Sequence, residues 1–185
     1  MELILIRHPQ PEVAPGVCYG SSDLPAAAAA LAQGHAALTP QLAPLLARGA
    51  HLYSSPLRRC SALAGLLGAP TLDARLAEMD FGAWELRAWS DIPRAEVDAW
   101  AADLLDYRPG GGETVREVAA RVQSFLYQLH DRQQGAVIVC HAGTMRLMAA
   151  MAAGEPLLHA AQKPNQVKYC SILRLTWPAQ AAKPV

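Results

Sequence analysis

The sequence predicts an α/β fold with a mainly parallel central sheet flanked by helices, as a single domain across residues 1–185. Three short apolar runs, rich in Val, Ile and Leu, lack the polar alternation of a strand with one exposed face. Stretches with helical periodicity lie between these runs, as in folds built from alternating strands and helices. A hydrophobic content of 52% supplies enough apolar side chains for one core.

Four segments predict strands. The apolar runs at residues 3–6, 136–140 and 171–175 predict buried strands, and residues 51–53 predict a weaker one. Val, Ile and Leu without intervening polar residues suit strands that are covered on both faces. The sheet therefore draws its strands from both ends and from the first third of the chain.

Helices are predicted between the strands. The clearest, at residues 113–132, places apolar residues on one stripe at intervals of three and four. Residues 56–67 and 144–153 predict two more. The alanine-rich residues 25–50 contain prolines and polar residues, which excludes a membrane-spanning helix but leaves their secondary structure open. Residues 80–112 are rich in Trp and Asp, end in a glycine run, and predict an excursion from the sheet that covers a site.

Composition limits the partners and the compartment. Lys+Arg and Asp+Glu both number 16, so no net field points to nucleic acid or to a membrane surface, and any anion site must be local. The four cysteines form no CxxC pair, which favours free thiols in a reducing cytoplasm over disulfides or a zinc site. Glu2 is acidic and the apolar stretch after it is too short for a signal peptide, so we expect a cytoplasmic location.

Cationic and imidazole side chains follow three of the predicted strands. Arg7 and His8 come after the first strand, Arg58 and Arg59 follow the weak strand, and His141 follows the third in chain order. Open α/β sheets bind ligands at the carboxyl ends of their strands, so these side chains are expected to meet at one edge of the sheet. A single histidine at a strand end is usually structural, but the coincidence at three strand ends favours a functional site.

The arginine pair carries an electrostatic signal. Ser55 is a suitable N-cap and Pro56 a suitable first helical residue, so Arg58 and Arg59 fall in the first helical turn. The helix dipole disfavours cations there. Either both side chains bend into solvent, or at least one faces an anion near the helix start. A guanidinium suits phosphate, because its fork donates two parallel hydrogen bonds.

These residue types suit phosphoryl transfer. A neutral imidazole is a capable nucleophile near pH 7, since its unperturbed pKa is roughly 6.5. Arginines neutralise the phosphate oxygens that repel the nucleophile. An alkoxide is a poor leaving group, so a general acid is also needed. The candidates are Glu78, Asp80 and Glu85, which composition does not separate and which can also be ordinary exposed loop acids.

Five motifs occur along the chain: LIRH at residues 5–8, SPLRRC at 55–60, EMDFGAWE at 78–85, GGET at 111–114 and VCHAG at 139–143. Together, and in this order, they resemble the histidine phosphatase superfamily, also called the phosphoglycerate mutase-like family. No single motif is decisive, but the set is specific and spans most of the chain. The resemblance implies the fold of that family and a phosphatase that needs neither a cofactor nor a metal.

The resemblance implies a role for each matching residue. His8 is the nucleophile that becomes phosphohistidine, and Arg7 and Arg59 bind the phosphate. His141 holds the phosphoryl group opposite His8. Glu78 gives a proton to the leaving oxygen and later accepts one from the attacking water, which singles it out among the three candidate carboxylates.

The sequence leaves the roles of some positions open. Glu113 and Thr114 match a substrate-binding loop, but they are also typical of an ordinary helix start. Arg58 falls on a variable position of its motif. A metal site built on His8 and His141 is a poorer alternative, because the neighbouring arginines repel a cation and no third ligand has suitable spacing.

The chain departs from the family pattern at two glycines. Pro9 stands where Arg-His-Gly is usual. It fixes its own φ, pushes His8 towards an extended conformation and removes one N–H that could face phosphate. Leu86 stands where Trp-Glu-Gly is usual. These differences bear on substrate specificity more than on phosphoryl chemistry.

Three stretches are similar to the α-ribazole phosphatases, a group within the superfamily: RHPQP at residues 7–11, GVCYGSSDLP at 16–25 and EMDFG at 78–82. The resemblance implies a small-molecule phosphomonoester, α-ribazole 5′-phosphate, and a place in assembly of the cobalamin lower ligand. The excursion holds five aromatic residues: Phe81, Trp84, Trp89, Trp100 and Tyr107. We expect at most two of them to contact the aromatic base. Alternatives are a sugar-phosphate or nucleotide phosphatase, a mutase, or a phosphate-binding module without catalysis.

Overall fold

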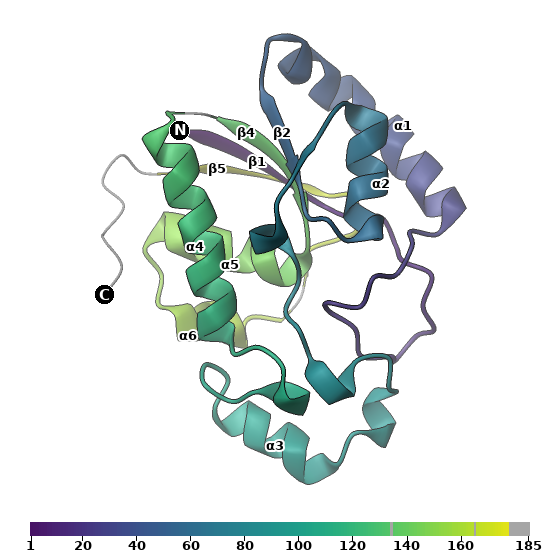
Figure 1. Cartoon of the computed structure of the whole chain (residues 1–185), viewed down its shortest axis with the longest axis vertical. Coiled ribbons are helices and arrows are strands. Elements are labelled where there is room, and N and C mark those ends of the chain that lie inside the picture. Colours follow the sequence, from purple (N-terminus) through teal and green to yellow (C-terminus); the bar gives the residue numbers. More distant parts are fainter. Residues whose placement is uncertain (134, 165, 178–185) are drawn as a thin grey trace.

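The computed structural model describes residues 1–133, 135–164 and 166–177, which build a five-stranded sheet between two layers of helices (Figure 1). The strands are β1 (Glu2–Arg7), β2 (His51–Ser54), β3 (Thr71–Leu72), β4 (Ala136–Cys140) and β5 (Ile172–Thr176). Their order is β3-β2-β4-β1-β5, and all neighbours are parallel except β5, which runs antiparallel to β1. The predicted mainly parallel sheet is confirmed, while β3 has too few residues to leave a sequence pattern.

The helices are α1 (Ala28–Ala47), α2 (Arg58–Leu67), α3 (Arg94–Ala102), α4 (Val115–Asp131), α5 (Ala142–Ala153) and α6 (Leu157–Gln162). The helices predicted between the strands are confirmed as α2, α4 and α5. The predicted cap of α2 is wrong: Leu57 is extended and precedes the helix, and Ser55 lies further back in the chain. The Ser55 hydroxyl accepts from the Leu57 N–H at 3.3 Å and lies 2.9 Å from His141 Nε2, so it links the residue before the helix to another strand end.

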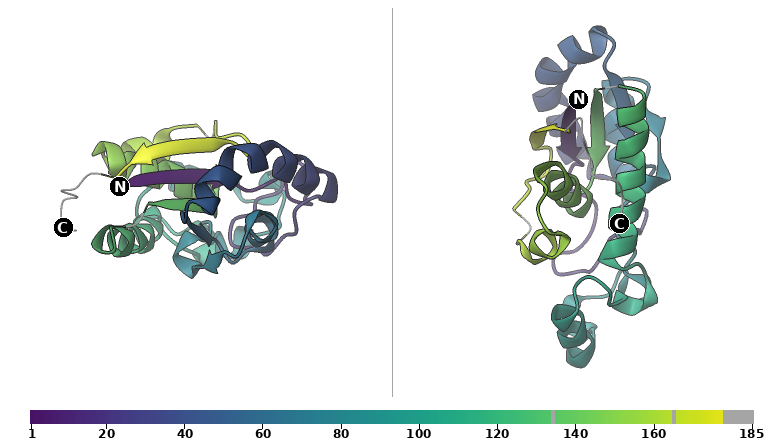
Figure 2. Two further views of the ribbon diagram at one scale, coloured as in Figure 1. Left: turned by 90° about the horizontal axis from the view of Figure 1, so that it is seen from above. Right: turned by 90° about the vertical axis from the view of Figure 1, so that its left-hand side faces the viewer.

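The sheet lies between helices (Figure 2), and its side chains alternate between two cores. Leu3 and Leu5 of β1 point to the face covered by α4, α5 and α6. Ile4 and Ile6 point to the face covered by α1 and α2. This alternation follows from the two-residue period of a strand. All four side chains are buried, as a run without polar residues predicts.

Helix α1 forms in the alanine-rich segment although Pro40 and Pro44 lie inside it. Each proline removes one main-chain N–H from the helix. Leu38 and Leu42 are buried in the core that α1 shares with α2 and the sheet. Most helical stability in proteins comes from such packing of an apolar face, and here it offsets the lost hydrogen bonds. The local sequence pattern does not predict this helix, because its stability depends on tertiary packing.

Residues 80–112 leave the sheet as predicted and contain α3 with three short 3₁₀ turns. They pack around Trp84, which is buried beside Cys18 and Ile92. Trp84 Nε1–H donates to Glu96 at 2.7 Å, so the buried indole nitrogen has a partner. This small third core holds the excursion together at the lower end of the molecule in Figure 1.

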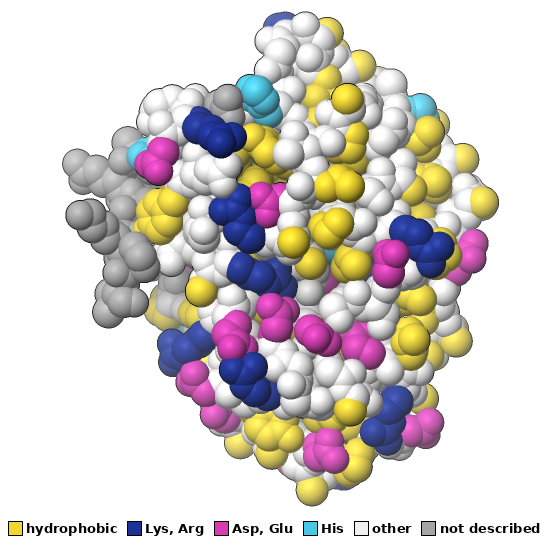
Figure 3. Space-filling model, viewed as in Figure 1, with side chains coloured by type: hydrophobic (Ala, Val, Ile, Leu, Met, Phe, Trp, Pro, Cys, Tyr) yellow, Lys and Arg dark blue, Asp and Glu magenta, His cyan; other side chains and the backbone are white. Residues whose placement is uncertain are grey.

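The expected single domain reaches residue 185, but residues 134, 165 and 178–185 lie outside the described residues. In the described part, no helix is both long enough and apolar enough to cross a membrane. Acidic and basic side chains are intermingled on the face shown in Figure 3. This distribution agrees with the equal numbers of the two charges in the sequence.

Leu86 has a φ of 64°, in the left-handed region that favours glycine. We expect Leu86→Gly to raise the free energy of unfolding by about 0.5–1 kcal/mol. Left-handed backbone costs a non-glycine residue about 1–2 kcal/mol, and glycine loses about 0.5–1 kcal/mol of chain entropy in return. Urea denaturation measures the change. The control is Leu66→Gly, similarly exposed inside α2, for which we expect a loss of about 1 kcal/mol. An equal loss from Leu86→Gly contradicts the prediction.

Candidate active site

The carboxyl ends of β1, β2 and β4 lie side by side. Arg7 is in register with Cys140, and the His8 N–H extends this pairing by donating to the Cys140 carbonyl at 3.0 Å. His141 follows directly, so its ring lies next to that of His8 with the centroids 5.1 Å apart. Ser55 follows β2, and its hydroxyl meets His141 Nε2. The prediction that these strand ends meet at one edge of the sheet is confirmed.

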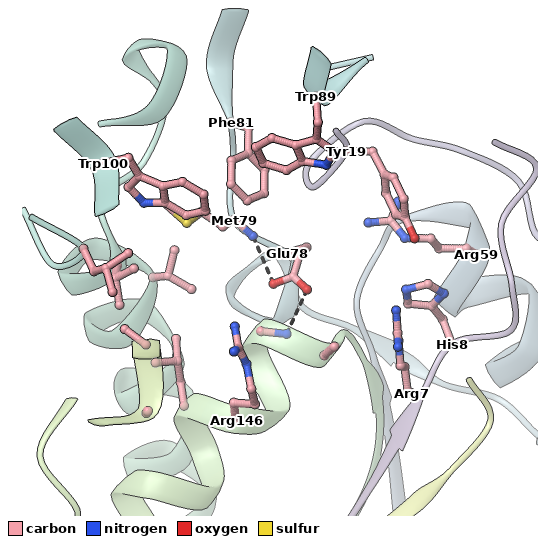
Figure 4. A pocket seen from close by; sticks show the side chains of 18 of the residues that line it. Arg7, His8, Tyr19, Arg59, Glu78, Met79, Phe81, Trp89, Trp100 and Arg146 are labelled. Atoms are coloured by element: carbon pink, nitrogen blue, oxygen red, sulfur yellow. Dashed lines mark hydrogen bonds between the residues drawn. The ribbon is translucent and has the colours of Figure 1, made fainter. Parts of the chain in front are cut away.

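A cavity of about 390 Å³ opens at this edge (Figure 4). Its volume suits a small molecule. Arg7, His8, Tyr19, Arg59 and Glu78 are among the residues that line it. The rest of the lining is mostly aromatic and aliphatic, so the cavity has a charged end and an apolar end.

The His8 ring is oriented by the residue that follows it. Nδ1 lies 2.6 Å from the Pro9 carbonyl oxygen. A carbonyl oxygen only accepts hydrogen bonds, so Nδ1 carries the proton and Nε2 keeps a free lone pair. Pro9 lacks the N–H of the expected glycine, yet its carbonyl leaves His8 Nε2 with the lone pair that a nucleophile needs.

Both imidazoles are held in the neutral form. Burial, then the Arg59 guanidinium and to a smaller extent that of Arg7, lower the pKa of His8 from 6.5 to about 3, against the effect of the Pro9 hydrogen bond. Complete burial, followed by the nearby His8 and Arg59, lowers the pKa of His141 well below its ordinary value. The ring that would attack is therefore unprotonated at neutral pH.

Arg59 is completely buried, whereas Arg58 points to solvent. Arg59 donates Nη1–H to the Ser22 carbonyl at 2.7 Å and Nη2–H to the Gly20 carbonyl. Its Nε–H is buried and has no acceptor among the described residues. Arg58 instead forms an exposed ion pair with Asp23 at 3.2 Å. The alternative in which both side chains bend into solvent is therefore wrong, because Arg59 is buried.

Arg7 is covered by Tyr169. Its guanidinium carbon lies 4.0 Å from the centre of that ring, and Nη1–H donates to the Val167 carbonyl. The Arg7 Nε–H, like that of Arg59, is buried without an acceptor in the described part of the chain. The hydroxyls of Tyr169 and Tyr19 lie 3.0 Å apart and join the two loops beside His8. The sequence does not predict this contact, because the two tyrosines are 150 residues apart.

Glu85 organises the loop that receives Arg59. Its carboxylate accepts hydrogen bonds from the N–H groups of Gly20, Ser21 and Ser22 at 2.9–3.2 Å, and also from the Ser22 hydroxyl. The carbonyls of this same loop accept from the Arg59 guanidinium. Glu85 is thus committed to main-chain hydrogen bonds and supports Arg59 indirectly.

Glu78 is the candidate carboxylate that lines the cavity. Its Oε2 accepts from the Gly143 N–H at 3.0 Å. A Cβ at Gly143 would lie 2.4 Å from Oε1, so only glycine allows this approach. Asp80 accepts instead from the Gly82 N–H at 2.8 Å, within its own loop. The structure therefore separates the three carboxylates that composition left together.

Glu113 and Thr114 are not among the residues that line this cavity. Thr114 caps α4 in a capping box with Glu117. Glu113 forms an ion pair with Arg121 at 2.8 Å, and Arg121 donates to the Glu78 carbonyl at 3.1 Å. The helix-start interpretation accounts for the contacts of Thr114. Glu113 supports the main chain at Glu78 through Arg121.

No group of three His, Cys, Asp or Glu side chains within residues 1–133, 135–164 and 166–177 comes together in a way that could bind a metal ion. The four cysteines are free thiols. Cys60 Sγ lies 3.4 Å from His141 Nε2, and burial raises the pKa of this thiol well above its ordinary value, so it stays neutral beside the imidazole.

A family model described as the histidine phosphatase superfamily (branch 1) matches residues 3–184. The chain belongs to the histidine phosphatase superfamily. Solved structures of similar chains agree. TTHB049 from Thermus thermophilus is 28% identical with a TM-score of 0.76, over 96% of this chain and 91% of that one. A mycobacterial glucosyl-3-phosphoglycerate phosphatase in complex with VO3 is 26% identical with a TM-score of 0.78, over 95% of this chain and 92% of that one.

Curated relatives within the superfamily match a shorter stretch. The adenosylcobalamin/alpha-ribazole phosphatase of Escherichia coli (strain K12) is 33% identical over 86 residues, which is 44% of this chain and 42% of that protein. The protein of the same name from Salmonella typhimurium (strain LT2) is 32% identical over 80 residues, 40% of each. The matched part of the chain thus spans about two fifths of the length of these relatives.

The histidine pair that this superfamily member buries makes its stability depend on pH. His8 and His141 have lower pKa values folded than unfolded, so protonation favours the unfolded chain. Their contribution is complete above pH 6.5 and is lost as the pH falls, for His8 towards 3, at up to about 1.4 kcal/mol per pH unit for each ring. We expect urea denaturation at a series of pH values to show a steep loss between pH 6.5 and 4. His8→Asn should flatten the slope, and an unchanged slope contradicts the assignment.

Glu85→Gln is expected to lower the free energy of unfolding by about 1–3 kcal/mol. The amide replaces one acceptor oxygen with a donor that faces main-chain N–H groups, which then lack a partner. Thermal and urea denaturation measure the loss. Glu12→Gln is the matched control, because Glu12 is exposed, and its effect should stay within about 0.5 kcal/mol. Equal stability of the two variants argues against the loop-organising role of Glu85.

Proposed function

We propose that the chain is a phosphomonoesterase that works through a phosphohistidine and hydrolyses α-ribazole 5′-phosphate. One observation carries the proposal. Arg7 and Arg59 hold buried Nε–H donors beside His8 that have no acceptor in the described part of the chain, and His8 is neutral with a lone pair on Nε2. Two guanidinium groups match the charge of a phosphate dianion and can donate to its oxygens in parallel pairs.

In the first step, the phosphate group binds between Arg7 and Arg59, and His8 Nε2 attacks phosphorus. The N–P bond forms as the P–O bond to the alcohol breaks. Glu78 gives its proton to the leaving oxygen, so the alcohol departs neutral. His141 donates to a phosphoryl oxygen as charge builds up on it.

In the second step, a water molecule attacks the phosphorus of phosphohistidine. The Glu78 carboxylate, which has just lost its proton, takes one from this water. The N–P bond breaks, neutral His8 returns and inorganic phosphate leaves. Glu78 is then protonated again, so the cycle needs no external acid, metal or cofactor.

The choice of substrate is supported by the curated relatives and by the apolar end of the cavity. Both relatives are named adenosylcobalamin/alpha-ribazole phosphatase. Phe81, Trp89 and Trp100 line the cavity, where the aromatic base of a small-molecule phosphomonoester can stack. Trp84 and Tyr107, the other aromatics of the excursion, do not line it.

The free thiols support a reducing, cytoplasmic location.

His8→Ala is expected to lower kcat for α-ribazole 5′-phosphate at least about 1000-fold, because the covalent route is lost. Rapid quench of the wild-type enzyme with labelled substrate should trap an acid-labile phosphoenzyme, which the variant should not form. Both measurements use enzyme treated with a chelator and no added metal.

The matched control for this variant is His51→Ala, at the exposed start of β2, which should keep wild-type turnover and the phosphoenzyme. Full turnover by His8→Ala contradicts the covalent mechanism. A panel of phosphomonoesters tests the substrate: faster turnover of a sugar phosphate or nucleotide than of α-ribazole 5′-phosphate contradicts that choice alone. Tight phosphate binding without hydrolysis of any ester points to a binding module.

A further inference from the structure

Unpaired buried donors mark two places in the cavity rather than one. Among the described residues, five buried side-chain nitrogens lack an acceptor: Arg7 Nε, Arg59 Nε, Trp100 Nε1, Arg146 Nε and Trp177 Nε1. Four of the five belong to residues that line the cavity. The two beside His8 serve the phosphate in the proposed function. The other two, on Trp100 and Arg146, have no role in it. A buried donor without an acceptor is costly, so a bound ligand is a natural partner.

Arg146 lies beside the place where the alcohol must leave. It is on α5, three residues after Gly143, so the two share one face of the helix. The Gly143 N–H is bonded to Glu78, the proposed acid. In Figure 4 the Arg146 side chain rises from α5 towards the cavity, below Glu78. Its Nη1–H donates to the Lys163 carbonyl, which tethers one side of the guanidinium and leaves Nε–H unpaired.

Phe81, Trp89 and Trp100 form an aromatic wall along the other side of the cavity in Figure 4. The rings of Trp89 and Trp100 are nearly parallel, with an interplanar angle of 7° and centroids 6.1 Å apart. Phe81 stands edge-on to both. The wall therefore offers flat surfaces to a ring, and Trp100 Nε1–H adds an unpaired donor.

We propose that Arg146 and the aromatic wall form an alcohol-binding subsite. The subsite selects monoesters whose alcohol carries hydroxyl oxygens near the ester and a flat ring beyond them. Arg146 donates to the hydroxyl oxygens, and the ring stacks on the wall. The inference rests on the proposed function, since it assigns the leaving alcohol of that reaction to a place.

A substrate carboxylate is the competing partner for Arg146, because a guanidinium also binds carboxylates. The surroundings favour the neutral alcohol. Val115, Val118, Leu147 and Ala160 line the cavity as well, and apolar side chains of this kind do not solvate a second anion. A flat ring, in contrast, gains free energy from burial against them.

The test compares Arg146→Met with the wild type on two esters. One is α-ribazole 5′-phosphate, and the other is its 2′,3′-dideoxy analogue, which keeps the ring but lacks the hydroxyls. We expect the variant to lose about 10- to 100-fold in kcat/KM on the first ester, the size of a lost hydrogen bond to a charged group, and less than about threefold on the second. Ribose 5-phosphate, which lacks the ring, should be at least about tenfold poorer for the wild type.

Equal losses on the two ring esters overturn the proposal, since they mean that Arg146 only tethers the loop at Lys163. Fast wild-type turnover of 3-phosphoglycerate that Arg146→Met abolishes also overturns it, in favour of a carboxylate site. Ribose 5-phosphate turnover equal to that of α-ribazole 5′-phosphate overturns the role of the wall. If the wild type hydrolyses no ester, the proposed function itself is wrong. That result differs from each of the outcomes that overturn only the subsite.

Arg94→Met is the matched control, because Arg94 is an exposed arginine at the start of α3. It should leave the ratio between the esters unchanged. Should Arg146→Met fail to fold, Arg146→Lys replaces it. Lysine keeps the charge and can still donate to the Lys163 carbonyl, but it lacks the fork. A loss confined to the hydroxyl-bearing ester again supports the subsite, and equal losses again overturn it.

Discussion

The burial of Arg59 is the constraint on which the site depends. Its guanidinium is completely excluded from solvent, yet its partners are the carbonyls of Gly20 and Ser22 rather than a carboxylate. Carbonyl dipoles offset a full buried charge only in part, so the charge remains available to an anion. Burial is the largest cause of the lowered pKa of His8, and the Arg59 charge is the second largest. The positive charge available to an anion and the neutrality of His8 therefore share a cause.

The sheet holds the other partners at fixed distances from that charge. The register of β1 with β4 sets His8 next to His141, and a hydrogen bond to the Pro9 carbonyl selects the tautomer of His8. Loops from distant parts of the chain complete the arrangement. Tyr169 covers Arg7, while Glu85 fixes the main chain that receives Arg59. A rigid strand edge thus positions the two imidazoles, and loops position the charges around them.

The local sequence predicts the sheet, three of the helices and the meeting of His8 with His141, because strand runs and strand ends follow from neighbouring residues. It does not distinguish Arg58 from Arg59, which share one helical turn and both bond to the loop at residues 20–23, although Arg59 is buried and Arg58 is exposed. The resemblance to the family motifs is what singles out Arg59 as the phosphate-binding arginine. Glu85 contacts a loop more than 60 residues away, so local reasoning treats it as an ordinary acid. Arg146 leaves a weak signal, as the only charged residue in the apolar stretch at 142–153.

The excursion links the two ends of the cavity. It carries the aromatic wall, yet it also carries Glu85, whose carboxylate holds the loop beneath Arg59. Its main chain is joined to the same loop by hydrogen bonds between Cys18 and Leu86 and between Cys18 and Arg87, both at 2.8 Å. A shift of the whole excursion would therefore disturb the main-chain carbonyls that bind the Arg59 guanidinium. Substrate range in this scaffold can change more readily through the side chains of the wall than through movement of the segment that bears them.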